Sequence, residues 1–429
     1  MSVAVRSSDT PAADAAKLLI RLGLAILFVG LPCTGVFWRG AIYVLLPVGG
    51  VLILGGAALA SPEHKFRRLR DALVSPTGAT ALFLAFWAAL SLIWTPFPAE
   101  AGDRYLKSAA TTCLAILVAV FLPERTKTVD LYLLPVGLAL ASVATLVLAL
   151  FGPPWFLSSF AFDETLFERS MVTLIVLIWP ALGILSLREH WIAAAILAVL
   201  IAAVSLAGFA QIALLAMGAG AFVFAMAMSG PAKTARILGF GLAPLIILAP
   251  AIPLLYRLIL QVSGMEVGPG SLPLLIWSEL ITSQWPRLIT GHGLDFAYRS
   301  MSFGYLPEQA PKSLLFVIWY DFGLVGAVGF ATLTALAFSA AGRVAAQAAP
   351  AVLAGLVTVL TIAFLGIATA QIWWVTLLDC AVIAFALLVK GVYNVQRPDV
   401  QAIRAMEPEA RQELSHNGAG LSDQFPASS

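Results

Sequence analysis

Residues 314–341 read LLFVIWYDFGLVGAVGFATLTALAFSAA, and this run decides the fold class because it holds a single charged residue, Asp321, over a length that can cross a bilayer. Similar apolar runs recur along the 429 residues, of which 60% are hydrophobic and 11% are charged. A soluble domain carries about 25% charged residues. The chain is therefore predicted to be all-α, a polytopic bundle of transmembrane helices.

Twelve spans are predicted in one membrane domain. They lie at about residues 18–36, 41–60, 78–94, 109–122, 131–152, 171–187, 191–207, 209–229, 236–255, 314–341, 348–368 and 371–390. We expect a polar N-terminal segment at 1–17, the membrane domain over 18–390 and a polar, disordered tail at 391–429. The N-terminal segment lacks a signal-peptide pattern with a cleavage site, so the first span is expected to remain as an anchor.

The basic residues predict the orientation. Of the 25 Lys and Arg residues, seventeen lie in segments on the side of the N-terminus and eight on the other side. Because cytoplasmic loops are enriched in Lys and Arg, both chain ends are predicted to be cytoplasmic. The one long loop between spans nine and ten, residues 256–313, then faces the opposite compartment. Its cluster of Arg287, Arg299 and Lys312 indicates either contact with lipid headgroups or an anionic ligand.

Composition argues against several kinds of partner and site. A net charge of +2 does not favour nucleic acid. The three cysteines (Cys33, Cys113 and Cys380) are far apart and form no Cys-x-x-Cys pair, which argues against a disulfide framework or a metal site. The external carboxylates show no pairing at metal-ligand spacing. No metal and no cofactor are therefore predicted.

Residues 274–289, LLIWSELITSQWPRLI, place apolar side chains at helical spacing. They predict an amphipathic helix in the membrane interface, with Trp277 and Trp285 at the depth of the headgroups. This is typical of a plain interfacial belt, and it also suits a site that acts on a lipid-linked substrate.

Short blocks in the loops and at the helix ends follow one another in a distinctive order. They are residues 91–96 (SLIWTP), 168–170 (ERS), 178–180 (IWP), 274–277 (LLIW), 291–295 (GHGLD), 318–326 (IWYDFGLVG) and 371–374 (QIWW). In these blocks the chain resembles, over about residues 80–390, the bacterial O-antigen ligase and O-antigen polymerase superfamily. The resemblance implies a GT-C-like bundle in the bacterial inner membrane that serves lipopolysaccharide or exopolysaccharide biosynthesis.

The implied activity is that of a metal-independent glycosyltransferase acting at the periplasmic face. Glycan would pass from an undecaprenyl-pyrophosphate donor to another glycan or to a lipid A–core acceptor. Since pyrophosphate is already a good leaving group, its charge is what a protein can most usefully stabilise. Arginine binds two phosphate oxygens with its guanidinium fork. Arg169 and Arg299 are therefore predicted as catalytic residues that stabilise the pyrophosphate.

The chain departs from the family at two positions. The family has a His-Pro-His-Asn segment before the tenth span, whose second histidine is implicated in catalysis, whereas this chain has Ala310-Pro311-Lys312-Ser313. An arginine expected before Leu274 is Pro273. Lys312 is predicted as a third catalytic cation on the phosphate, and it could act as a base only if its surroundings lowered its pKa. Anchoring of the tenth span is its structural alternative.

The other candidate residues are expected to bind substrate or to shape its site. They are Arg287, His292, Gly291, Gly293, Asp295 and Trp277. His292 is the external histidine that could replace the missing base, although a lone histidine is more often structural. Asp295 is expected to cap the turn.

Three questions stay open at this stage. A catalytically degenerate scaffold of a polysaccharide assembly complex would keep the fold without the missing histidine. A transporter or flippase would explain Asp379 near the centre of the twelfth span. Within the enzyme hypothesis, ligase, polymerase and protein glycosylation are not separated by any motif.

Overall fold

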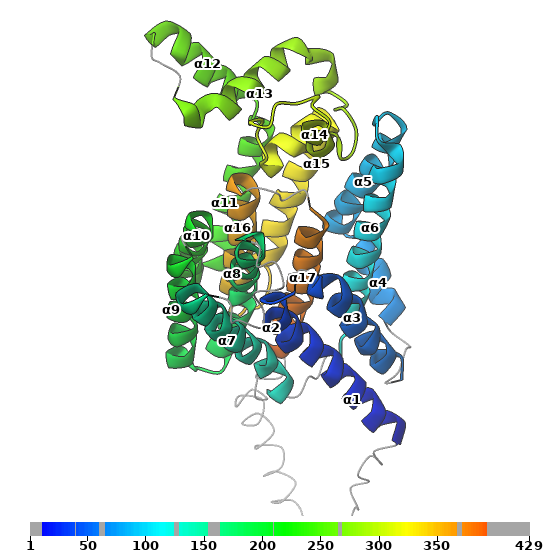
Figure 1. Cartoon of the computed structure of the whole chain (residues 1–429). Coiled ribbons are helices and arrows are strands. Elements are labelled where there is room, and N and C mark those ends of the chain that lie inside the picture. Colours follow the sequence, from blue (N-terminus) through cyan, green and yellow to red (C-terminus); the bar gives the residue numbers. More distant parts are fainter. Residues whose placement is uncertain are drawn as a thin grey trace, which may run out of the picture.

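A computed structural model of the chain describes residues 11–38, 40–59, 65–123, 128–152, 164–208, 210–264, 268–366 and 371–392. Within these ranges the chain forms helices and connecting turns, with no β-strand (Figure 1). The predicted disordered tail lies outside the described residues from position 393 onward, as do the first ten residues of the predicted N-terminal segment.

Nine candidate spans in the described part of the chain are long and apolar enough to cross a membrane. The helices that contain them are α1 (Pro11–Ala25) continued by η1 (Ile26–Gly30) and α2 (Leu31–Gly35), α3 (Ala41–Leu59), α5 (Pro76–Leu90) continued by η2 (Ser91–Ile93), α6 (Pro98–Phe121), α7 (Thr128–Phe151), α8 (Glu164–Leu187), α10 (Gln211–Ser229), α15 (Leu314–Ala341) and α17 (Ile372–Val392). The prediction of an all-helical chain with many membrane-crossing helices is confirmed to this extent.

The three other predicted spans differ from simple crossings. α9 (Trp191–Ala207) and α16 (Ala349–Leu365) have 17 residues each, at the short end of the roughly 17–25 residues that cross a bilayer. The span predicted at 236–255 is broken into α11 (Pro231–Ile247) and α12 (Ala251–Ser263), which are bent by 63°. Pro250 lies at this break and has no N–H to continue the helical ladder. Counting the bent pair as one span gives ten.

Helix α4 (Lys65–Val74), with the sequence KFRRLRDALV, lies between the second and third predicted spans and belongs to neither. One apolar side chain, Phe66, packs edge to face on Phe121 of α6, with ring centroids 5.6 Å apart. Arg67, Arg68 and Arg70 are exposed to solvent. This is the pattern of a helix that lies along a membrane surface rather than crossing it.

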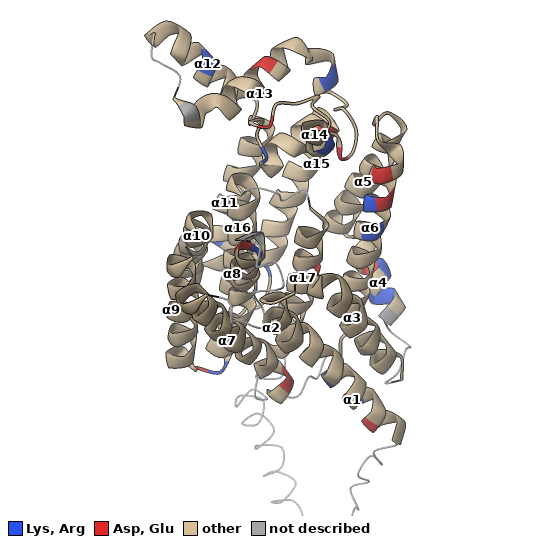
Figure 2. Cartoon of the chain, viewed as in Figure 1, with Lys and Arg blue, Asp and Glu red and all other residues tan. Residues whose placement is uncertain are grey.

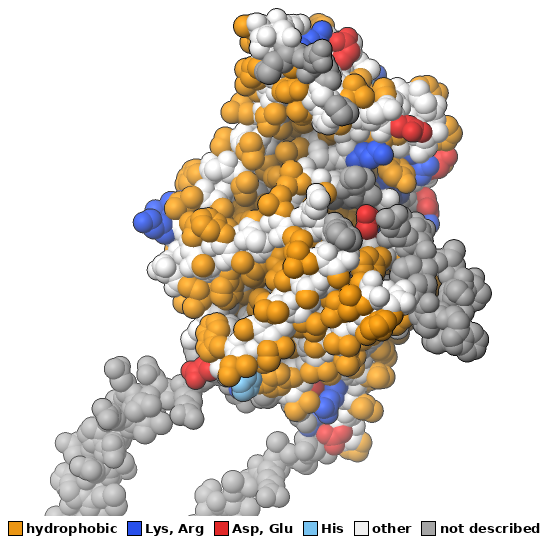
Figure 3. Space-filling model, turned by 60° about the vertical axis from the view of Figure 1, so that its left-hand side comes forward, with side chains coloured by type: hydrophobic (Ala, Val, Ile, Leu, Met, Phe, Trp, Pro, Cys, Tyr) orange, Lys and Arg blue, Asp and Glu red, His pale blue; other side chains and the backbone are white. Residues whose placement is uncertain are grey.

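The buried centre of the bundle lies on α8, α15 and α17, whose spans are more than half buried, whereas almost none of α5 is buried. Apolar side chains cover the face of the bundle seen in Figure 3, as expected for a surface in contact with lipid. α3, α9 and α10 carry no charged residue. Charged residues are more frequent on α4 and in the first turns of α6 (Figure 2).

The loop predicted at 256–313 contains the second part of α12, η3 (Pro269–Ser271), α13 (Leu272–Ser283), η4 (Trp285–Leu288) and α14 (Phe296–Ser302). These elements gather at one end of the bundle (Figure 1). The helix expected over 274–289 is thus α13, and it ends before the tight η4 turn. Trp277 is buried and packs edge to face on Phe316 at 5.6 Å. Trp285, by contrast, is 70% exposed, so only one of the two tryptophans is available to an interface.

Candidate functional site

The glycine loop, residues 291–295, lies directly on a break in α15. At Gly323 the backbone takes φ 63° and ψ −159°, which interrupts the helix and is open mainly to glycine. The N–H groups of His292 and Gly293 donate to the carbonyls of Tyr320 and Asp321, both at 2.9 Å. The break in α15 therefore presents backbone acceptors that hold the loop in place.

Residues 91–96, at the end of α5, hold the other side of the glycine loop. The Ser91 hydroxyl accepts from the N–H of Leu294 at 3.0 Å, and the Thr95 hydroxyl donates to the Leu294 carbonyl at 3.1 Å. A Cβ atom on Gly293 would lie 2.7 Å from the Cβ of Thr95, so no larger residue fits there. Three of the sequence blocks singled out above, 91–96, 291–295 and 318–326, thus meet in one place.

Asp295 is the electrostatic centre of this site. Its side chain is only 1% exposed, and its two carboxylate oxygens contact different arginines. Oδ1 pairs with Nη1 of Arg104 from α6, and Oδ2 accepts from Nε of Arg299 in α14 at 2.8 Å. The guanidinium of Arg104 also lies over the ring of Tyr298, 5.5 Å from its centroid. Asp295 occupies the N-cap position of α14, but its side chain makes no capping hydrogen bond there; it instead joins the loop to α6.

The two arginines keep partial access to solvent. The Arg104 side chain is 17% exposed and the Arg299 side chain 27%. A guanidinium has five N–H donors, and the bonds to Asp295 use few of them. The site therefore holds two oriented guanidinium groups with free N–H donors beside one carboxylate. It suits a diphosphate better than an anion with a single charge.

Asp321 fixes the small helix α14 that carries Arg299. It is almost fully buried in α15, and its Oδ1 accepts from the N–H of Ala297 at 2.8 Å. Ala297 lies in the first turn of α14, where N–H groups have no partner within the helix. Asp321, the single charged residue of the run 314–341, therefore positions α14 at the site.

His292 is held between aromatic rings, stacked on Tyr320 at 4.2 Å and on Phe296 at 5.0 Å. Its Nδ1 is 3.0 Å from the Tyr320 carbonyl. A carbonyl only accepts, so Nδ1 carries the proton and Nε2 keeps a lone pair. Burial lowers the pKa of His292 below its usual 6.5; the bond to the Tyr320 carbonyl opposes this shift and Arg287 adds to it. The ring is therefore neutral at pH 7.

The lowered pKa of His292 predicts a pH-dependent stability. At pH values between the usual pKa of His292 and its lower pKa in the folded protein, the unfolded chain binds more protons than the folded one. The free energy of unfolding therefore falls as the pH drops through this window, and it levels off below the folded pKa. Thermal unfolding of the purified protein between pH 5 and 8 measures this effect. His292→Asn should remove the loss of stability that protonation of His292 causes at low pH. If the variant keeps the pH profile of the wild type, His292 is not the group responsible.

Two further predicted residues, Arg287 and Lys312, belong to the same loop. Arg287, in η4, is exposed and lines a cavity of about 10 Å³ with His292, Tyr320, Gln284 and neighbouring apolar side chains. Lys312 is exposed and precedes Ser313, whose hydroxyl accepts from the N–H of Phe316 at the start of α15. Among the described residues no ion pair involves Lys312.

Arg169 belongs to a different cluster. Its Nη2 donates to Oε1 of Gln371 at 2.7 Å, and its guanidinium lies 5.1 Å from the ring centroid of Trp373. These contacts join α8 to the start of α17. Arg169 and Trp373 also line a cavity of about 30 Å³, together with residues of α2. The structure thus brings Arg299 together with Asp295, Gly291, Gly293 and His292, whereas the described contacts of Arg169 lie elsewhere.

Arg104 is the site residue that the sequence did not single out. It is one of the eight basic residues predicted to lie on the side of the membrane opposite the N-terminus, the same signal that pointed to Arg299. It follows Pro98 within the first two turns of α6, a position that looks like ordinary anchoring at a helix end. Glu100, Asp103 and Lys107 surround it in the same turns, so no local pattern sets Arg104 apart.

Within the described residues there is no group of three or more His, Cys, Asp or Glu side chains that could hold a metal ion. The arrangement is instead one of cations, a neutral imidazole and aromatic rings. No family model, no curated protein and no solved structure matches this chain.

Proposed function

We propose that this chain is a membrane glycosyltransferase of bacterial surface polysaccharide assembly, which transfers or polymerises glycan from an undecaprenyl-pyrophosphate donor. In this proposal twelve helices cross the inner membrane, both ends are cytoplasmic and the glycine loop faces the periplasm. The observation that carries the proposal is the pair of arginines, Arg104 and Arg299, oriented by the buried Asp295. Such a pair fits the two phosphates of the carrier.

The chemistry follows from these groups. An acceptor hydroxyl oxygen bonds to the anomeric carbon while the bond from that carbon to the pyrophosphate oxygen breaks, and the electron pair leaves with the pyrophosphate. Arg104 and Arg299 stabilise the charge that grows on the leaving group, where preorganised donors act most strongly. The hydroxyl proton passes to a base, and the lone pair on Nε2 of His292 can receive it. Lys312, in the same loop and just before α15, would supply a further cation for the phosphates.

A membrane-facing groove supports a lipid carrier. It has a volume of about 600 Å³ and lies between α5 and α15, lined by Phe83, Val328 and neighbouring apolar side chains. Above it, the indole N–H of Trp87 donates to the carbonyl of Phe322 at 3.1 Å, next to the break that holds the glycine loop. A polyprenyl chain in this groove would bring its pyrophosphate toward the arginine pair.

Transfer by the full-length protein tests the proposal directly. The protein in proteoliposomes is incubated with an undecaprenyl-pyrophosphate-linked glycan and with either lipid A–core or further lipid-linked glycan, in the presence of EDTA. We expect released undecaprenyl pyrophosphate together with a lengthened acceptor. Product on lipid A–core indicates a ligase, and longer lipid-linked chains indicate a polymerase. An unaltered donor with both acceptors would favour the scaffold instead.

A further inference from the structure

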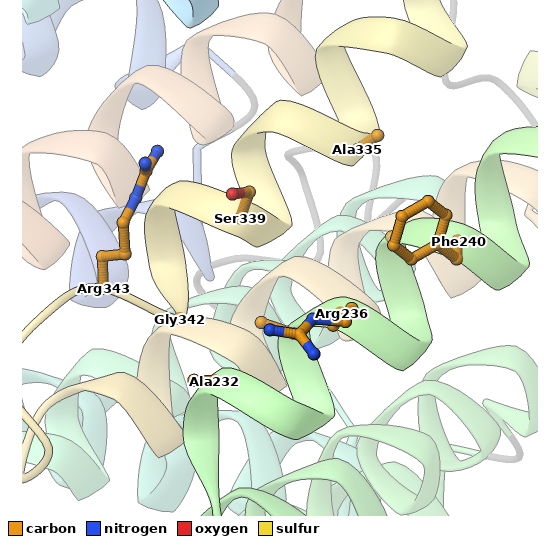
Figure 4. Close-up of a pocket in the computed structure, with 9 residues that line it drawn as sticks. Ala232, Arg236, Phe240, Ala335, Ser339, Gly342 and Arg343 are labelled. Atoms are coloured by element: carbon orange, nitrogen blue, oxygen red, sulfur yellow. The ribbon is translucent and has the colours of Figure 1, made fainter.

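A second groove lies between α11 and α15, at the end of α15 away from the glycine loop (Figure 4). Small residues bring the two helices close together there. A Cβ on Gly342 would lie 2.5 Å from the Cβ of Ala235, and one on Gly239 would lie 3.4 Å from the carbonyl oxygen of Ala335. Because these residues have little or no side chain, a groove of about 340 Å³ remains beside the contact.

The larger side chains that line this groove are cationic, polar or apolar, but not acidic. Arg236 and Phe240 come from α11, Ser339 comes from the last turn of α15, and Arg343 lies in the turn that follows α15 (Figure 4). Both arginines are exposed. No ion pair among the described residues involves either of them. The groove therefore presents two cations without a neutralising carboxylate in its lining.

The groove also has an apolar wall. Phe240 is 77% exposed, on a helix that forms half of a candidate membrane span. Its ring and the neighbouring Ala335 would be covered by an acyl chain but not by a small soluble anion. Guanidinium groups bind phosphate oxygens through paired N–H bonds, and the hydroxyl of Ser339 can donate another. Basic pockets between membrane helices are suited to acidic lipid headgroups.

We propose that this groove binds an acidic phospholipid. Its phosphate is held by Arg236 and Arg343, and one acyl chain lies against Phe240 and Ala335. Lys233, exposed in the first turn of α11, adds positive charge close to the headgroup. This site shares no residue with the glycine loop or the arginine pair, so it stands whether or not the chain transfers glycan.

Native mass spectrometry of the full-length protein in detergent tests the site. Phosphatidylglycerol is titrated in, and the lipids that remain bound are counted. Arg236→Gln with Arg343→Gln should weaken the tightest binding by roughly tenfold or more, since each arginine near a headgroup contributes substantially. Ala335→Phe should have the same effect, because its ring fills the groove while both arginines remain.

The matched control removes two exposed arginines from α4, with Arg67→Gln and Arg70→Gln, and it should leave the tightest binding unchanged. Equal loss in this control would show general attraction to charge and contradict a site in the groove. Wild-type binding in the variant without Arg236 and Arg343 would also overturn the proposal. Displacement of the lipid by millimolar inorganic phosphate would indicate a site for soluble phosphate instead. Thermal unfolding of every variant shows that the fold is retained.

Discussion

Replacing Arg299 by glutamine should lower glycan transfer by about 10²–10³-fold, the usual effect of removing one preorganised donor from a developing negative charge. Arg104→Gln should have an effect of similar size, because both guanidinium groups are oriented by the same carboxylate. The effect should fall mainly on kcat, since the charge on the pyrophosphate grows as its bond to the sugar breaks. Transfer by the variants in proteoliposomes, at saturating donor, measures it.

Lysine variants separate charge from geometry at these positions. Arg299→Lys keeps the positive charge but loses the planar fork, so it should retain part of the activity that Arg299→Gln loses. Arg257 provides the matched control in the same loop: it forms an exposed ion pair with Glu279 at 2.9 Å and contacts no residue of the glycine loop. Arg257→Gln should transfer glycan at the wild-type rate. Full activity of Arg299→Gln, or an equal loss in the control, would reject the arginine pair as the phosphate site.

The apolar runs of the sequence predict most helix positions, but not their breaks. Hydropathy reports which residues avoid water, so α15 is found at its observed bounds of Leu314–Ala341. The pattern at 236–255 is equally apolar on both sides of Pro250, and it therefore does not reveal the 63° bend between α11 and α12. Helix α4 is not found by hydropathy, because it is rich in basic residues, although Phe66, Leu69 and Leu73 recur in it at helical spacing.

The candidate site was predictable only in part. The sequence indicates which side of the membrane a residue faces, but not which other residues it contacts there. The excess of basic residues on one side predicts which arginines share a compartment, and it led to the grouping of Arg169 with Arg299. Partners depend on tertiary contacts: Gln371 and Trp373 bind Arg169, whereas Asp295 binds Arg299. The ion pair of Asp295 with Arg104 joins residues 191 positions apart, which no local pattern reveals.

Asp295→Asn should destabilise the folded protein by about 3 kcal/mol, because removing one partner of a buried ion pair leaves its charges uncompensated. The two arginines would then face each other across a neutral amide, although their partial exposure to solvent limits the cost. Asparagine preserves the side-chain volume and tolerates the left-handed backbone of this position, where φ is 66°. The change therefore tests charge rather than backbone strain. The midpoint of thermal unfolding in detergent measures the loss.

The control is Asp103→Asn on α6, whose exposed ion pair with Lys107 contributes at most about 1 kcal/mol. Its midpoint should stay close to that of the wild type, and an equally stable Asp295→Asn protein would show that the carboxylate does not hold the arginines. A triple variant with Asp295→Asn, Arg104→Gln and Arg299→Gln removes every charge of the network, so it should regain much of the lost stability. Recovered stability without recovered transfer would separate the two roles: the carboxylate orients the arginines, and the arginines act on the donor.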